Sequence, residues 1–322
     1  MECEARYHPS GDQLALASAL DESLTSLLPL SRLHAAQEET AEIWASLHEL
    51  GVFGIGLSEE RGGSGLGTVE EALIVTGLGR RLIAPAVLAT IGATHVMPDQ
   101  SADVLGRTRR ATPAYRHNDR IVVVQDATAD LLLMRDGANA ALFETGPYES
   151  KVIDDRNWSA GLREGAMPNK LIARLESSQL LRLRLIDAAA LAGIAEAAVE
   201  MSVAYAGFRE QFGRPIGSFQ AVKHHCANMA IAARCARDQT NFAAVAIDDG
   251  RADAGLQVEC ALFVAGSAAR ENAGKNIQIH GGMGFSDEAD PHLLLKRAQL
   301  LIAIAGGLEA ANARIADMKS AW

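Results

Sequence analysis

Aromatic residues and cysteines are scarce in this sequence, and long apolar runs are missing. Aromatic residues make up 5% of the 322 residues, whereas alanine and leucine are abundant, which favours helices. No uncharged run reaches about 18 apolar residues, so the sequence predicts no membrane span. The first segment, MECEARYHPSGD, has no basic stretch followed by an apolar one, and we expect no signal peptide. No C-x-x-C spacing is present, which is typical of reduced thiols in a cytoplasmic protein; the four cysteines are Cys3, Cys226, Cys235 and Cys260.

Positive charge is also in short supply. The chain has 30 Lys and Arg against 40 Asp and Glu, a net charge of −10. This balance argues against nucleic acid or an anionic membrane surface as the main partner, although a local basic patch could still bind a phosphorylated small molecule. Hydrophobic residues make up 48% of the chain, which is enough to bury a sizeable core.

Apolar patterning divides the chain into three regions. Residues 1–104 have leucines at helical spacing and predict a helical N-terminal domain, interrupted by a glycine-rich loop at residues 54–67. Residues 105–176 contain short runs such as RIVVVQ and DLLLMR between turn residues, and predict a small β domain. Residues 177–322 return to long helical patterns with short connections, which predicts an antiparallel four-helix bundle with its last helix over residues 290–318. The predicted fold class is therefore mainly α with a small β domain.

The stretch YAGFREQFGRPIGSFQAVKHHCANM, residues 205–229, joins two of the predicted bundle helices. Its glycines and proline predict a turn, and Ser218 is a good N-cap for the helix that follows. Arg209 stands beside this turn, where a guanidinium and the free N–H groups of a helix start suit a phosphate. A plain connection between helices and a phosphate site are both compatible with the stretch.

A second stretch, GKNIQIHGGMGFSDEADPH, places three glycines among histidines and acids at residues 274–292. His280 and His292 are separated by a turn, and the acids lie where a helix start favours negative charge, so we expect no metal site. The glycines would instead let the backbone approach a ligand closely.

Together, REQFGRPIGSFQAVKH and IQIHGGMGFSDEADPHLLLKRA resemble motifs of the acyl-CoA dehydrogenase family of flavoproteins. The upstream GVFGIGLSEERGGSGLGTVEEALIVTGLGRRL resembles that family's N-terminal domain, and the order of the three regions also matches. The resemblance covers the N-terminal third and the C-terminal half well, and the middle poorly. It implies an enzyme that binds FAD, oxidises an acyl-CoA to the trans-2-enoyl-CoA and passes electrons to an electron-transfer flavoprotein.

The resemblance also implies which residues contact the cofactor. In the family, the turn and the glycine loop of one subunit reach the adenine and pyrophosphate end of a neighbour's FAD. Carried over residue by residue, these positions are Arg209, Gln211, Phe212, Ile216, Phe219, Gln220, Gln278, Gly281 and Gly282.

The sequence departs from the family at the catalytic base. The two positions where members carry the catalytic carboxylate hold Ala305 and Leu183, and neither side chain can abstract a proton. Asp187 lies one helical turn from Leu183 on the same face and is a candidate catalytic residue. Alternatively, this aspartate in an apolar stretch is paired with Arg182 or Arg184.

The segment with which the family's β domain cradles the flavin ring is absent as well, since VLGRTRRATPAYRHND is followed directly by RIVVVQDATAD. Short relatives of this kind occur in two-gene, heterotetrameric acyl-CoA dehydrogenases, some of which act on steroid side-chain CoA esters. The leading hypothesis is therefore an FAD-dependent acyl-CoA dehydrogenase subunit that lacks the base and works with a second acyl-CoA dehydrogenase-like subunit. The alternatives are a homo-oligomeric enzyme using Asp187 and a flavin-free structural protein of the same fold.

Overall fold

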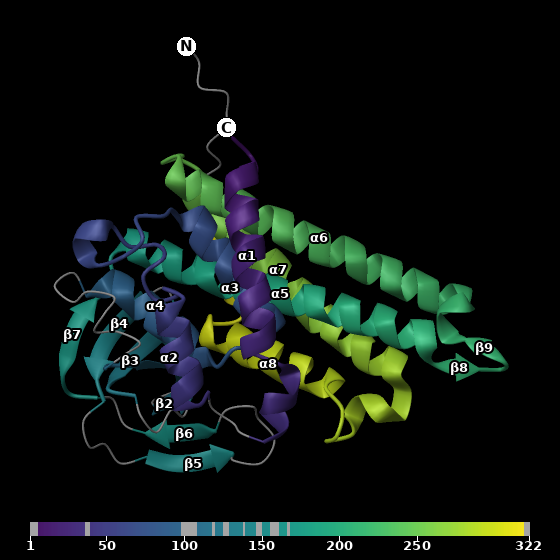
Figure 1. The fold of residues 1–322 in the computed structure, drawn as a ribbon. Coiled ribbons are helices and arrows are strands. Elements are labelled where there is room, and N and C mark those ends of the chain that lie inside the picture. The colour runs from purple at the N-terminus through teal and green to yellow at the C-terminus, as the bar shows by residue number, and fades with distance from the viewer. Residues whose placement is uncertain are drawn as a thin grey trace.

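The computed structural model of the protein describes residues 6–35, 39–97, 108–117, 120–124, 129–137, 139–145, 150–154, 161–165 and 168–318. A group of N-terminal helices, a twisted sheet and a bundle of long helices follow one another along the chain (Figure 1). The predicted fold class, mainly α with a small β domain, is confirmed. The boundaries of the three regions stay a prediction.

The N-terminal part is helical. It contains α1 (Gly11–Leu27), α2 (Ala41–Glu49), α3 (Thr68–Arg80) and α4 (Pro85–Val96), with 3₁₀ turns η1 (Leu30–His34) and η2 (Glu59–Arg61). Helix α3 begins directly after the glycine-rich loop. Its first N–H groups, those of Thr68 and Val69, donate to the carboxylate of Asp248 at 2.9 and 3.1 Å. This carboxylate satisfies two of the free donors of the helix start and connects the N-terminal part to the bundle.

The middle part forms a seven-stranded sheet in the order β5-β6-β2-β1-β3-β4-β7 within the described ranges. The strands are β1 (Ala111–His117), β2 (Arg120–Val124), β3 (Leu131–Asp136), β4 (Asn139–Glu144), β5 (Ser150–Asp154), β6 (Leu162–Gly165) and β7 (Leu171–Arg174). Strands β1 and β3 are parallel, and the other neighbours are antiparallel. Within the described residues, the run RIVVV forms β2 and the run LLLMR lies in β3, as predicted. Their central residues, Ile121–Val124 and Leu131–Met134, are all apolar because the sheet is covered on both faces at β2 and β3.

The C-terminal part contains the long helices. They are α5 (Ser177–Phe208), α6 (Gln220–Asp248), α7 (Ala254–His280), α8 (Pro291–Ile304) and α9 (Leu308–Asp317), with the hairpin β8 (Glu210–Gln211) and β9 (Arg214–Pro215) and the 3₁₀ turns η3 (Ile216–Ser218) and η4 (Gly281–Phe285). The prediction of one helix over residues 290–318 is wrong. Gly306 and Gly307 adopt φ of 93° and 88°, a left-handed conformation that ends α8 and separates it from α9.

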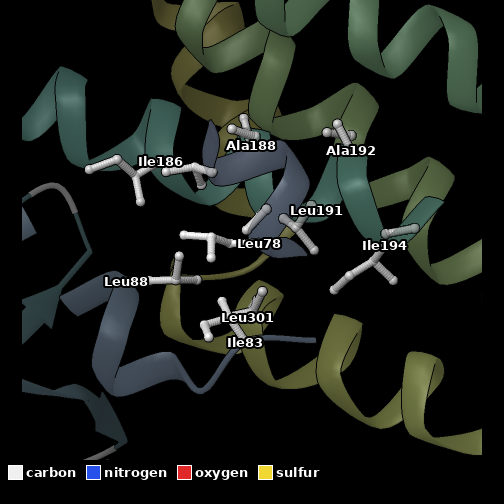
Figure 2. Close-up of a cluster of buried hydrophobic side chains, with 14 of the residues drawn as sticks. Leu78, Ile83, Leu88, Ile186, Ala188, Leu191, Ala192, Ile194 and Leu301 are labelled. Atoms are coloured by element: carbon white, nitrogen blue, oxygen red, sulfur yellow. The ribbon is translucent and has the colours of Figure 1, made fainter. Parts of the chain in front are cut away.

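Helix α5 lies at the centre of the molecule and contacts α3, α4, α6, α7 and α8. Its segment Ala188–Ala195 is apolar on all sides, which is the pattern of a helix buried all round. In Figure 2, Leu78 of α3 lies between Leu191 of α5 and Ile83, and Leu301 of α8 closes the cluster. The alanines of α5, such as Ala188 and Ala192, leave room for several neighbouring helices to approach the same segment. This packing fixes the middle of α5, and the predicted cofactor turn begins at its C-terminal end.

Candidate functional site

The two predicted cofactor motifs meet at one end of the bundle. The ring of Tyr205, near the end of α5, stacks on the ring of His280, the last residue of α7, with centroids 4.0 Å apart. His280 Nδ1 lies 2.8 Å from the carbonyl oxygen of Asn276, which holds the imidazole in place. Arg209 and Gly281 follow these two helix ends directly, so the turn and the glycine loop are neighbours in space despite their separation along the chain.

The hairpin β8–β9 projects from this end of the bundle (Figure 1). Its two central residues, Phe212 and Gly213, adopt φ of 54° and 73°, as a type I′ turn requires. A phenylalanine in this conformation costs about 1–3 kcal/mol. The ring is nevertheless 93% exposed, so its cost is not offset by burial within this chain. An exposed apolar side chain on a strained backbone is a strong indication of a contact made outside the chain.

Arg209 is the C-cap of α5 and is exposed. Its guanidinium has no hydrogen-bond partner within the part of the chain that the structure describes. Helix α6 begins at Gln220 without a side-chain cap, so its first N–H groups remain available to an anion. The prediction of Ser218 as N-cap is wrong: the turn η3 makes Phe219 the N-cap, and Ser218 Oγ is buried without a partner in the described ranges.

Phe219 follows the hairpin and contacts two of its residues. The Phe219 ring lies edge-on to Phe212, at 6.2 Å between centroids, and the Arg214 guanidinium lies over it at 4.2 Å. Ile216 is half-buried at the foot of the hairpin. Gln211 Nε2 donates to the carbonyl oxygen of Glu210 at 2.7 Å, so this amide donor is used within the hairpin.

The glycine loop presents its backbone to the outside. Gly281 adopts φ 62° and ψ −138°, a conformation open almost only to glycine. A Cβ added at Gly281 or Gly282 would meet no atom of the chain within 4 Å, so the space beside both residues is open to a ligand. Gln278 is exposed, and its Oε1 accepts a hydrogen bond from Lys275 Nζ at 2.9 Å.

Within the described ranges, no three His, Cys, Asp or Glu side chains gather closely enough to hold a metal ion.

The two positions at which the family carries its base are both buried. Leu183 is 2% exposed and belongs to an apolar cluster with Leu133 of β3. A Cβ added at Gly92 of α4 would lie 2.6 Å from Leu183 Cδ1, which shows how closely α4 and α5 approach there. Ala305 is buried at the end of α8. Neither position offers a polar group to a substrate.

Asp187 is buried, at 2% exposed, and its carboxylate accepts two hydrogen bonds from the guanidinium of Arg135 on β3. The predicted pairing with Arg182 or Arg184 is wrong. Those arginines face other neighbours of α5 and pair with Glu71 and Glu259 respectively. Burial raises the pKa of Asp187, although Arg135 and Arg184 act in the opposite direction. A role of Asp187 as base stays a prediction, and its contacts are those of a buried ion pair.

A second buried carboxylate, Glu71 of α3, is not among the residues predicted from the sequence. It lies 2.7 Å from His95 Nε2 of α4 and 2.9 Å from Arg182 Nε of α5. Burial acts to raise the pKa of Glu71, but His95 and Arg182 outweigh it and lower the pKa to about 2. An acid within the apolar stripe of TVEEALIV is the sequence signal that could have revealed this cluster.

Comparison with known proteins identifies the family. The family model for the acyl-CoA dehydrogenase C-terminal domain matches residues 174–319, and the model for the N-terminal domain matches residues 11–100. The chain belongs to the acyl-CoA dehydrogenase family. The resemblance of the quoted motifs is thereby confirmed, and the chain is a divergent member of this family of oxidoreductases, whose members are flavoproteins.

Individual relatives show how far the likeness extends. Acyl-CoA dehydrogenase FadE34 of Mycobacterium tuberculosis is 33% identical over 84% of this chain, which spans only 42% of FadE34. Acyl-CoA dehydrogenase IpdE2 of the same organism is 29% identical, with 80% of each chain covered. The crystal structure of the ChsE4-ChsE5 complex from Mycobacterium tuberculosis has a TM-score of 0.77 at 21% identity, covering 98% of this chain and 100% of that chain, which shows a common fold. Each helix in the described ranges is too short or too polar to span a bilayer.

Proposed function

We propose that this chain is a subunit of an FAD-dependent acyl-CoA dehydrogenase. Its hairpin and glycine loop contact an FAD that is held mainly by a second acyl-CoA dehydrogenase-like subunit. The observation that carries the proposal is a contrast in exposure. The residues that reach a neighbour's cofactor in the family are presented outward, with Phe212 at 93% exposed, whereas the position of the base, Leu183, is sealed at 2% exposed.

The hairpin β8–β9, the start of α6 and the glycine loop together form an outward-facing edge of the bundle. This outward edge suits the ADP half of FAD. The Arg209 guanidinium can bind a pyrophosphate through a bidentate pair of hydrogen bonds, and the uncapped start of α6 adds N–H groups and partial positive charge. Phe212 and Phe219 supply apolar ring surfaces beside this charge. Gly282 leaves space for a ligand to lie against the backbone. The residues present therefore fit the cofactor.

Exposed apolar side chains at the same end of the bundle support an interface between subunits. Phe208 is 70% exposed and Phe285 is 73% exposed, and the exposed Met283 lies between Gly282 and Gly284 in the loop. Soluble proteins seldom leave several large apolar side chains uncovered in one place unless a partner covers them. The partner we propose is the subunit that holds the FAD.

The region of this chain that corresponds to the family's active site supports the assignment of the base to a second subunit. When bound, FAD supplies a two-electron acceptor that takes the β-hydrogen of the acyl-CoA as a hydride. Removal of the α-proton needs a carboxylate, and neither Leu183 nor Ala305 provides one. The Arg135–Asp187 pair joins β3 directly to α5 beside Leu183. We therefore assign the base and the acyl-CoA site to the second subunit, with an electron-transfer flavoprotein as the acceptor of the electrons.

The ChsE4-ChsE5 complex from Mycobacterium tuberculosis supports the hetero-oligomer as the form of the enzyme. ChsE4 and ChsE5 form a complex with each other, and a chain of that complex shares the fold of this protein. Such an assembly explains why the outward edge keeps the cofactor-binding motifs of the family while the base position, Leu183, is buried and apolar. One chain completes the cofactor site of the other and needs no base of its own.

Substitution of Arg209 tests the proposal. The full-length chain is purified with its partner subunits from its native host, and retained FAD is measured by absorbance after gel filtration. Loss of a charge-assisted hydrogen bond costs about 1.5–3 kcal/mol, so Arg209→Ala should weaken FAD retention about tenfold or more. Arg234→Ala is the matched control, since Arg234 lies exposed on α6 and pairs only with Asp238 in the described ranges. Equal retention in both variants would refute the assignment.

A further inference from the structure

A pocket of about 250 Å³ lies where α1, α3, α5 and α6 meet. Its lining residues on α6 belong to the middle of that helix, and none of its lining residues is among those that the family motifs assign to the cofactor. The volume is slightly below the range of about 300–1,000 Å³ that is typical of small-molecule sites. An occupant of this pocket must therefore be a small molecule.

The pocket has an apolar end and a charged end, because α1 and α3 run in the same direction. Gln13 Nε2 donates to Glu70 at 3.1 Å near the starts of these helices, and Asp21 pairs with Arg81 at 2.7 Å farther along both. The apolar lining residues come from the earlier turns, and they are Leu14, Ala17 and Leu73. This end suits a short hydrocarbon group.

Glu196 of α5 is the central acid of the charged end. It is buried, and its Oε1 accepts a hydrogen bond from Arg237 Nε of α6. Its Oε2 lies 3.8 Å from Arg80 Nη1, beyond hydrogen-bond distance, because Arg80 donates to Glu200 at 2.6 Å instead. Burial raises the pKa of Glu196, although Arg237 and Arg80 act in the opposite direction. Oε2 can therefore accept a hydrogen bond from a further cation.

Two residues of α6, Arg237 and Asn241, offer donors to the same pocket. They are one helical turn apart and so lie on the same face of the helix. Arg237 uses Nε for Glu196, and its two Nη groups make no hydrogen bond within the described ranges. Asn241 is only 6% exposed, and its amide has no hydrogen-bond partner in the described part of the chain. A buried amide seldom stays unpaired, and two free N–H groups of a guanidinium fit a carboxylate.

We propose that this pocket binds a free apolar α-amino acid of about the size of leucine. The carboxylate of the ligand accepts hydrogen bonds from Arg237 and Asn241, and its ammonium group donates to Glu196 Oε2. Its side chain packs on Leu14 and Leu73 at the apolar end. The inference goes beyond the proposed function, because these residues lie outside the outward edge. Since the occupant connects α1 and α3 to α5 and α6, its binding should raise the melting temperature.

Calorimetric titration of the full-length protein in its native assembly tests the inference. The probes are leucine, 4-methylpentanoate, which lacks the amino group of leucine, and 3-methylbutylamine, which lacks the carboxylate. Leucine should bind and raise the melting temperature. Each analogue loses charge-assisted hydrogen bonds, so each should bind about tenfold or more weakly than leucine.

Two variants alter the pocket in different ways. Arg237→Gln removes the partner of the carboxylate, and Ala17→Leu fills the apolar end. Both should weaken leucine binding about tenfold or more. The matched controls are Arg234→Gln and Ala19→Leu, at exposed positions of α6 and α1 that do not line the pocket, and both should bind leucine as the parent does.

Three results would overturn the inference: no leucine binding, an analogue that binds as tightly as leucine, or leucine binding that both pocket variants retain. FAD content is measured on the same samples and should equal that of the parent in all four variants. Failure of the amino-acid site and failure of the proposed function are thereby distinguishable.

Discussion

The carboxylate of Asp187, on α5, accepts two hydrogen bonds from the guanidinium of Arg135, on β3. The pair joins the sheet to the central helix and lies one helical turn from Leu183, where the family places a catalytic carboxylate. The acid one turn from that position is thereby engaged in a structural contact rather than presented to a substrate.

Asp187→Asn should therefore act on stability. It leaves the buried Arg135 without its counter-charge, which typically costs about 3–5 kcal/mol. Chemical denaturation measures the loss. The double variant Arg135→Met/Asp187→Leu, which removes both charges, should recover most of the free energy of unfolding. An Asp187→Asn protein of parental stability that has lost turnover would instead identify Asp187 as the base.

Glu71 should make folding dependent on acid pH. Its pKa in the folded protein is about 2, below the ordinary 4.5, because His95 and Arg182 stabilise the ionised form. The stabilisation is fully present above pH 4.5 and is lost as the pH falls toward 2. It amounts to about 3 kcal/mol from the size of the shift. Urea denaturation across the acid range, from neutral pH downward, measures it.

A glutamine variant isolates this effect. Glu71→Gln should be less stable at neutral pH and should show a flatter decline below pH 4.5. Glu49→Gln, on the exposed face of α2, should follow the parent curve. Parallel curves for the parent and Glu71→Gln would show that Glu71 is not the origin of the acid sensitivity.

Gly281 and Gly282 should respond differently to the same substitution. Both have open space where a Cβ would lie, but only Gly281 has the backbone conformation reserved for glycine. Gly281→Ala should cost about 1–3 kcal/mol of stability and Gly282→Ala very little. If Gly282 lies against the cofactor, Gly282→Ala weakens FAD retention without a change in melting temperature. Equal melting temperatures for the two variants would contradict the assignment of Gly281 as a conformational glycine.

Phe212 should lower the stability of the chain while strengthening FAD retention and subunit association. Phe212→Asn creates the Asn-Gly pair that type I′ turns favour, and it removes an exposed apolar ring. The melting temperature should stay equal or rise, while FAD retention and subunit association weaken. A variant that keeps both properties would show that the strained phenylalanine makes no contact outside the chain.

Much of this architecture can be predicted because it depends on local periodicity. The apolar stripes mark the long helices, and the runs around Ile121 and Leu131 mark strands of the sheet. The break at Gly306–Gly307 is signalled by the glycine pair, which the prediction of one helix over residues 290–318 did not weigh against the apolar residues on both sides. Ser218 has the side chain of a helix cap, but the 3₁₀ turn before α6 displaces it from the cap position by one residue.

Local periodicity does not predict contacts between residues that are far apart along the chain. Arg135 and Asp187 are 52 residues apart, so neither one's neighbours along the chain reveal the other. The same holds for Glu71, whose partners come from two other helices. The outward edge is found more readily, since the turn and the glycine loop each carry a motif of their own. The family comparison agrees with those motifs, whereas the role of each residue in them awaits the variants above.

The number of FAD molecules per chain tests the central proposal most directly. Native mass spectrometry of the full-length protein, purified with its partners from its native host, gives both the subunit composition and the flavin content. We expect a hetero-oligomer of two kinds of acyl-CoA dehydrogenase-like chain with about one FAD for every two chains. A homo-oligomer with one FAD in every chain, or a monomer without flavin, would contradict it.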